Sequence, residues 1–258
     1  MSDQITVEVK AGVQTLRFSR PEKKNALNRA MYSALAEALA AGERSSDVRV
    51  HLFAAEGTVF TAGNDLKDFL ERKDSLASGA PAVAFLEALV TAEKPLVAAV
   101  DGLAVGIGTT LLLHCDLVYA TPASLFRTPF VDLGLVPEAA SSLLLPQRAG
   151  HARAFELLCL GVTFDAARAE QAGIVNAVVH AADLETRALS AARELAAKPQ
   201  AALLQARRLM RGAPGPTLER MRQELAVFNE RLASPEAQQA LRSFFDTHVA
   251  DHSWARQG

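Results

Sequence analysis

The segment KPLVAAVDGLAVGIGTTLLLHCDLVYAT, residues 94–121, contains the pattern that decides the fold. An apolar, β-rich run (94–102) ends in a glycine loop, and GIGTTLLLHC (106–115) then has the character of a helix. The run DLVYAT (116–121) follows as the next strand. A strand, a helix and another strand in succession favour parallel pairing, because parallel strands need a crossover connection.

The same alternation extends toward the N-terminus. Alternating residues around Ala11–Gly12 predict a hairpin of two strands, and Asn28 is expected to cap a helix over 29–43. DVRVHLFAAE (47–56) predicts a further strand. A glycine loop, a short helix and another helix over PAVAFLEALVTAE (81–93) come next. The chain is therefore predicted to form a layered α/β fold.

Beyond about residue 150 the sequence becomes mostly helical, with one strand-like piece, GIVNAVV (173–179). RGAPGP (211–216) is the clearest linker, since Pro and Gly interrupt regular structure. After it, apolar residues recur at three- and four-residue steps on one helical face. Such a stripe indicates either core packing or contact with a neighbouring subunit; it consists of Leu218, Met221, Leu225, Phe228 and Leu232.

Composition excludes several classes of protein. The formal net charge of −2 over 258 residues gives no basic surface for nucleic acid. Cys115 and Cys159 lack metal-ligand spacing, so we expect free thiols and no metal site. Residues 95–120 are apolar but are interrupted by Asp101 and Asp116, which argues against a membrane span. With no secretory signal pattern at the N-terminus, a cytoplasmic location is expected.

Two glycine loops, FTAGNDL (60–66) and VDGLAVGIG (100–108), share one design. Each follows a strand and precedes a helix, and its small residues allow close approach of a ligand to backbone N–H groups. Together they could form an oxyanion hole, although each alone could be no more than a tight turn. A dinucleotide-binding loop is disfavoured because Leu111 stands where the third glycine would be.

A single carboxylate, Glu138, stands within the otherwise uncharged run GLVPEAASS (134–142). One interpretation is that it caps a helix, because acidic residues are common in a first helical turn. The other is that it is a base in an apolar pocket, where burial tunes its pKa.

Four segments, 20–28, 60–69, 100–120 and 126–150, resemble the crotonase superfamily of enoyl-CoA hydratases and isomerases. Their sequences are RPEKKNALN, FTAGNDLKDF, VDGLAVGIGTTLLLHCDLVYA and FRTPFVDLGLVPEAASSLLLPQRAG. The resemblance implies an α/β spiral of ββα units over residues 1–200. It also implies a helical C-terminal region, 201–258, that forms homotrimers or hexamers.

The resemblance also implies an acyl-CoA thioester as substrate, with coenzyme A part of that substrate and no separate cofactor. The thioester oxygen would accept hydrogen bonds from the N–H groups of Ala62 and Ile107, and Glu138 would be the catalytic base. The implied substrate-binding residues are Ala26, Ala62, Gly63, Asn64, Asp65, Leu66, Ile107 and Phe130.

Departures from the family pattern narrow the expected reaction. Related hydratases carry two glutamates that handle water, and here those positions hold Thr110 and Phe130. The segment around Glu138 is similar to the peroxisomal type of Δ3,Δ2-enoyl-CoA isomerase, which implies conversion of 3-enoyl-CoA to 2-trans-enoyl-CoA in fatty acid β-oxidation. The alternatives are hydratase-related chemistry, dienoyl-CoA isomerisation, dehalogenation and a non-catalytic acyl-CoA-binding homologue. Enzymes that catalyse dienoyl-CoA isomerisation or dehalogenation normally carry aspartate where this chain has Glu138.

Overall fold

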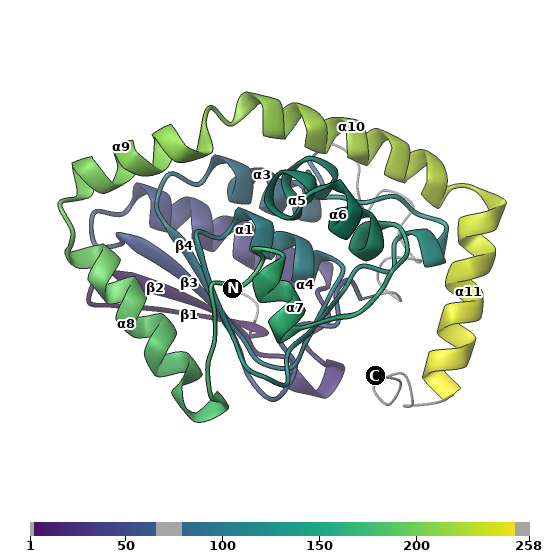
Figure 1. The fold of residues 1–258 in the computed structure, drawn as a ribbon, viewed down its shortest axis with the longest axis horizontal. Helices are drawn as coiled ribbons and strands as arrows, with labels where there is room; N and C mark the ends of the chain where they lie inside the picture. The colour runs from purple at the N-terminus through teal and green to yellow at the C-terminus, as the bar shows by residue number, and fades with distance from the viewer. Residues whose placement is uncertain (1–2, 66–78, 251–258) are drawn as a thin grey trace.

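The computed structural model describes residues 3–65 and 79–250, with side chains described as far as Phe244. The short helix predicted after residues 57–65, and Leu66, lie outside this part of the chain. Figure 1 shows the strands at the centre of the molecule and the long C-terminal helices along its outside.

The main sheet has six strands in the order β1-β2-β3-β4-β6-β9. The first two form the predicted antiparallel hairpin, and every later neighbouring pair is parallel, as predicted. The strands are β1 (Ile5–Lys10), β2 (Val13–Phe18), β3 (Val50–Ala55), β4 (Leu96–Val100), β6 (Leu117–Ala120) and β9 (Ala177–Val178).

The central strands are apolar because both faces of the sheet are covered. In β4, Val97 and Ala99 belong to a core that includes residues of helix α8 (Leu184–Ala197), while Ala98 and Val100 belong to a larger core on the other face. The α8 residues in this contact are mainly alanines, so the helix packs closely on the sheet; they are Ala188, Ala191, Ala192 and Ala196.

A second, three-stranded sheet has the order β5-β7-β8, with β5 (Leu103–Val105), β7 (Leu125–Arg127) and β8 (Phe164–Asp165). The chain passes from β4 directly to β5 and then to a helix, and from β6 to β7 and then to a 3-10 turn. This repetition confirms the expected spiral of ββα units. The step into β5 requires glycine at position 102, because a Cβ there would lie 2.0 Å from the Thr58 carbonyl oxygen.

Helices α1 (Arg29–Arg44) and α3 (Pro81–Thr91) contribute to the larger core and contact each other. Asn28 caps α1 as predicted, its side-chain oxygen accepting from the Met31 N–H at 3.0 Å. The single helix predicted over 106–115 is instead a short α-helical turn followed by a 3-10 turn. These are α4 (Ile107–Thr110) and η2 (Leu111–His114).

Shorter elements connect the two sheets to the C-terminal helices. Near the N-terminus the loop before α1 holds the 3-10 turn η1 (Pro21–Lys23). The other elements that the structure describes before residue 200 are η3 (Val131–Leu133), α5 (Ser141–Ala149), α6 (His151–Leu158), α7 (Ala166–Gln171) and η4 (Ala181–Asp183). The run after residue 150 is therefore mostly helical, as predicted.

The C-terminal region consists of α9 (Gln200–Arg211), α10 (Gly215–Leu232) and α11 (Pro235–Ala250). Figure 1 shows α9 and α10 crossing above the rest of the fold and α11 running down one side. The apolar stripe of α10 packs into the larger core of its own chain, which decides between the two interpretations of that stripe. None of the described helices is long and apolar enough to cross a lipid bilayer.

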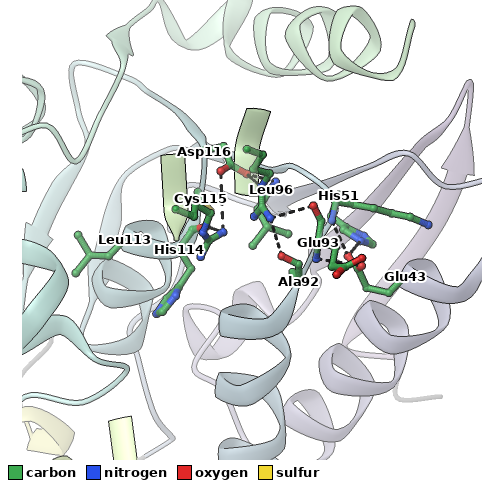
Figure 2. Close-up of polar contacts among 12 residues, drawn as sticks. Glu43, His51, Ala92, Glu93, Leu96, Leu113, His114, Cys115 and Asp116 are labelled. Carbon is green, nitrogen blue, oxygen red and sulfur yellow. Dashed lines mark hydrogen bonds and ion pairs between the residues drawn. The ribbon is translucent and has the colours of Figure 1, made fainter. Parts of the chain in front are cut away.

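Polar side chains tie α9 to the beginnings of β4 and β6. The Asp116 carboxylate accepts from the Leu96 N–H and from Arg207 Nε, each at 2.8 Å. Arg207 also donates to the carbonyls of Ala92 and Glu93, which lie beside Leu96 in Figure 2. The charge of Asp116 is thus used to fix the C-terminal region to the sheet.

A second polar cluster is buried around His51 in β3. The His51 Nδ1 lies 2.7 Å from Gln14 Oε1, and its Nε2 lies 3.0 Å from Glu43 Oε1 (Figure 2 shows His51 beside Glu43). Glu43 also accepts from the N–H groups of Glu93 and Lys94. This cluster joins the end of α1 to the loop before β4.

Candidate active site

Glu138 lies in the loop between η3 and α5 and is 6% exposed. Burial raises the pKa of its carboxyl to about 8, although a hydrogen bond from Thr110 acts to lower it and the charge of Glu224 acts to raise it further. A carboxyl with a pKa near neutrality can both take up and release a proton, which is the property required of a proton shuttle.

The Thr110 hydroxyl donates to Glu138 Oε1 at 2.5 Å. Thr110 is the last residue of α4, the helical turn that follows the second glycine loop. The hydroxyl therefore fixes the direction of the Glu138 carboxylate from the side of that loop. It occupies the position where the resemblance places one of the two glutamates of a hydratase.

The helix-capping interpretation of Glu138 does not fit the structure. Helix α5 begins at Ser141, whose N–H donates to the backbone carbonyl of Glu138, while the N–H groups of the residues on either side are bound by Glu224 of α10. The carboxylate oxygens of Glu224 accept from the N–H of Ala140 at 2.6 Å and of Ser142 at 2.9 Å. The Glu138 side chain is thus free of the capping role and is directed to Thr110 instead.

The backbone immediately after Glu138 has an uncommon conformation. Ala139 and Ala140 have φ angles of 60° and 56°, in the left-handed region that residues with a Cβ rarely adopt. His114 Nε2 donates to the Ala139 carbonyl at 2.8 Å. Burial lowers the pKa of His114 to about 3, so the ring is neutral and serves as a hydrogen-bonded core residue.

The two glycine loops lie side by side. The Thr61 N–H donates to the Leu103 carbonyl, and the Val105 N–H donates back to the Thr61 carbonyl, both at 3.0 Å. Gly63 has a φ of +88°, and a Cβ there would lie 2.8 Å from the Val105 carbonyl oxygen. The similar design of the two loops therefore corresponds to direct contact between them.

The backbone N–H groups of these loops differ in availability. The Ala62 N–H donates to the Lys24 carbonyl at 3.0 Å, so it could bind a thioester oxygen only by giving up that bond. Within residues 3–65 and 79–250, no acceptor is bound to the N–H of Asn64 or of Ile107. The available pair is therefore Asn64 and Ile107, and the expectation for Ala62 is at odds with the geometry.

Tyr32 connects the first glycine loop to Glu138. Its hydroxyl donates to Asn64 Oδ1 at 2.5 Å. Burial raises the pKa of Tyr32 well above its usual value, and the charge of Glu138 raises it further. The first glycine loop and the candidate base thus share one site.

Of the other expected substrate-binding residues, Ala26 and Asp65 lie close to each other. Arg20 Nη1 donates to the Ala26 carbonyl at 3.0 Å and to Asp65 Oδ2 at 2.7 Å, so the loop around Ala26 and the first glycine loop are held together. Phe130 is buried in the larger core just before η3. Among the described residues, no group of three or more His, Cys, Asp or Glu side chains could hold a metal ion.

Sequence reasoning missed three residues of this region: Arg20, Tyr32 and Glu224. Arg20 stands within one of the family-like segments and could have been noticed as a charge next to a binding loop. Tyr32 and Glu224 lie on helices whose pattern indicates only packing, and no local signal separates them from neighbouring core positions.

Comparisons with known proteins identify the family of the chain. The family profile described as enoyl-CoA hydratase/isomerase matches residues 8–254. The chain is 36% identical over 208 residues to 1,2-epoxyphenylacetyl-CoA isomerase of Escherichia coli K12, covering 77% of this chain and 78% of that protein. It is 32% identical to enoyl-CoA delta isomerase 2 of Rattus norvegicus, covering 94% of this chain but 63% of the longer rat protein.

A solved structure shows the same fold. The enoyl-CoA hydratase/isomerase from Pseudoalteromonas atlantica T6c superposes with a TM-score of 0.90 at 40% identity, covering 95% of this chain and 98% of that chain. The matched profile spans both sheets apart from the start of β1, both glycine loops and the helices α9, α10 and α11. The chain therefore belongs to the enoyl-CoA hydratase/isomerase family.

Proposed function

We propose that the chain is an acyl-CoA isomerase that converts 3-enoyl-CoA to 2-trans-enoyl-CoA in fatty acid β-oxidation. The observation that carries the proposal is one buried carboxylate, Glu138, held by the Thr110 hydroxyl near two backbone N–H groups that have no acceptor within the described part of the chain. Glu224 is also buried nearby, but both of its oxygens accept backbone N–H bonds, so it is not available to activate a water molecule. The related hydratases carry two glutamates that handle water, and the corresponding positions here are Thr110 and Phe130.

The proposed reaction uses Glu138 twice. Its carboxylate removes a proton from C2 of the substrate, and the electron pair of that C–H bond moves toward the thioester carbonyl. The negative charge on the carbonyl oxygen is stabilised by the N–H groups of Asn64 and Ile107. The protonated Glu138 then delivers the proton to C4, which leaves the double bond between C2 and C3 and restores the carboxylate.

The proposal also includes the contacts with the substrate and the assembly of subunits. The loop around Ala26 is proposed to contact the nucleotide end of coenzyme A, and Gly63, Asp65 and Phe130 to line the acyl thioester. The assembly proposed with it is a homotrimer or a pair of trimers. The large exposed apolar side chains of Leu209 and Met210 on α9 support a contact between subunits.

Other reactions of the family remain rivals, because relatives of similar identity are named as a 4-chlorobenzoyl coenzyme A dehalogenase and as a probable enoyl-CoA hydratase. A coupled assay on 3-enoyl-CoA and 2-enoyl-CoA substrates separates isomerisation from hydration. Binding of acyl-CoA without turnover of any substrate would instead indicate a non-catalytic homologue.

The proposal is tested with Glu138→Gln, which preserves shape and removes the base. We expect kcat to fall by about 10²-fold or more while acyl-CoA binding is retained. Glu170→Gln, at an exposed position on α7, is the matched control and should leave kcat unchanged. A Glu138→Gln protein that isomerises 3-enoyl-CoA at the original rate would overturn the proposal.

A further inference from the structure

We propose that Glu224 of the C-terminal helix α10 is a positioning residue for Glu138, acting through the backbone of residues 139–142. The inference rests on the proposed function and adds to it a residue from a different part of the chain. It assigns to α10 a role in the reaction itself, in addition to its packing in the core.

The first argument is the pair of hydrogen bonds that Glu224 makes. A helix normally receives its cap from the side chain of its own N-cap residue. The N-cap of α5 is Ala140, whose methyl group cannot accept a hydrogen bond. Glu224 supplies both missing acceptors from another helix, binding the N–H groups of Ala140 and Ser142. A negative charge at this helix end is also favoured by the helix dipole.

The second argument is the strained backbone that these bonds hold. Left-handed φ angles are unfavourable for a residue with a side chain. Two alanines in succession, Ala139 and Ala140, adopt them directly after Glu138. Such a conformation persists only where surrounding contacts fix it. Glu224 fixes it from one side and His114, through the Ala139 carbonyl, from the other.

The third argument is the position of Glu224 within its own helix. It is 7% exposed and stands among the buried residues Met221, Leu225 and Phe228 of the apolar stripe. A carboxylate in such surroundings is unfavourable unless it is hydrogen-bonded. Burial raises the pKa of Glu224 to about 6, although its hydrogen bonds to residues 140 and 142 act to lower it. A core position that needs only packing would not require a charge.

Glu224 also acts on Glu138 through its charge. The other side chains that act on Glu138 are Tyr32 from α1 and Thr110 from α4. The neutral His114 of η2 acts only through its hydrogen bond to the Ala139 carbonyl. Arg220, also on α10, donates to Ser142 Oγ at 3.3 Å. Because the charge of Glu224 raises the pKa of Glu138, removing it has an effect that loss of a structural cap alone would not have.

The experiment compares Glu224→Gln with Glu230→Gln, an exposed control on the same helix. In Glu224→Gln we expect the acid limb of the pH profile of kcat/KM to move to lower pH by about one unit, because a like charge has been removed. We also expect the plateau kcat to fall at least about tenfold, with KM little changed, because the base is less well placed. Glu230→Gln should match the unsubstituted chain.

A second measurement keeps the test independent of turnover. The ionisation of Glu138 is followed by infrared spectroscopy of its carboxyl band, identified by its absence in Glu138→Gln. If the unsubstituted chain does not isomerise 3-enoyl-CoA, the proposed function fails, while this titration still reports on Glu224. An unchanged Glu138 midpoint in a folded Glu224→Gln protein would overturn the positioning role. Thermal unfolding of both variants establishes that they are folded.

Discussion

Replacing Thr110 by valine removes one hydroxyl from the candidate site and preserves the shape of the side chain. That hydroxyl donates to Glu138 Oε1 at 2.5 Å and stabilises the ionised carboxylate. Without it, the protonated form of Glu138 is favoured more strongly, and its pKa rises further above the value of about 8. The Thr110→Val protein should therefore need a higher pH to reach full activity.

The size of the effect follows from the strength of the hydrogen bond. A hydrogen bond to a charged group is worth about 1.5–3 kcal/mol. This corresponds to a rise of about 1–2 units in the pKa of Glu138, since one unit is about 1.4 kcal/mol. At pH 7 the ionised fraction would fall from about a tenth to about a hundredth or less, so kcat/KM should fall about 10- to 100-fold.

The assay is the pH profile of kcat/KM for isomerisation of a 3-enoyl-CoA substrate. The midpoint of the acid limb should move upward in Thr110→Val, and most of the lost activity should return on the alkaline side of the new midpoint. Thr110→Ser keeps a hydroxyl and is the control, with a midpoint near the original. A Thr110→Val profile that is lowered equally at every pH, or whose midpoint does not move, would refute the reasoning.

Three further outcomes are expected. Hydration of 2-enoyl-CoA by the unsubstituted chain should be very slow, since Thr110 and Phe130 provide no pair of carboxylates; efficient hydration would contradict this. Truncation after Gly212 should cause aggregation, seen by light scattering, because it exposes the core that α10 covers; a monodisperse, active product would be inconsistent with that. Burial acts to raise the pKa of Glu43, but the bonds of Glu43 with His51 and with backbone N–H groups outweigh burial and lower the pKa. Glu43 therefore contributes to stability above about pH 4.5, and this contribution is lost as the pH falls below that value. Glu43→Gln should therefore reduce the free energy of unfolding at pH 7 by about 1–3 kcal/mol and weaken its acid dependence in denaturant titrations, and an unchanged acid dependence would count against this.

Local patterns predicted the parts of the fold that depend on local physics. The hairpin at Ala11–Gly12, the Asn28 cap and the strand–helix–strand succession around residues 94–121 all follow from spacing and turn residues. A helix over 106–115 was also predicted, but the chain forms a short α-helical turn and a 3-10 turn there. The apolar pattern of that segment is compatible with either form of helix, so it could not decide between them.

The candidate site was predictable where one residue stands out from its surroundings. Glu138 is a lone charge in an apolar run, and the structure buries it. The available N–H group of the first glycine loop was not predictable, because the choice between Ala62 and Asn64 depends on a bond to the Lys24 carbonyl. Glu224 was missed for a similar reason, since its partners Ala140 and Ser142 are far away in sequence.

The position of Glu224 near the C-terminal end of the chain has a consequence for biosynthesis. Every strand of both sheets, both glycine loops and Glu138 itself leave the ribosome before α10 does. N-terminal parts of a chain can begin to fold while the rest is still being made. If Glu224 is needed to hold the Glu138 loop, a nascent chain can assemble its sheets and the N–H groups for a thioester while its base is still loosely placed. The full rate of proton abstraction would then be reached only after α10 has emerged and Glu224 has bound the N–H groups of Ala140 and Ser142.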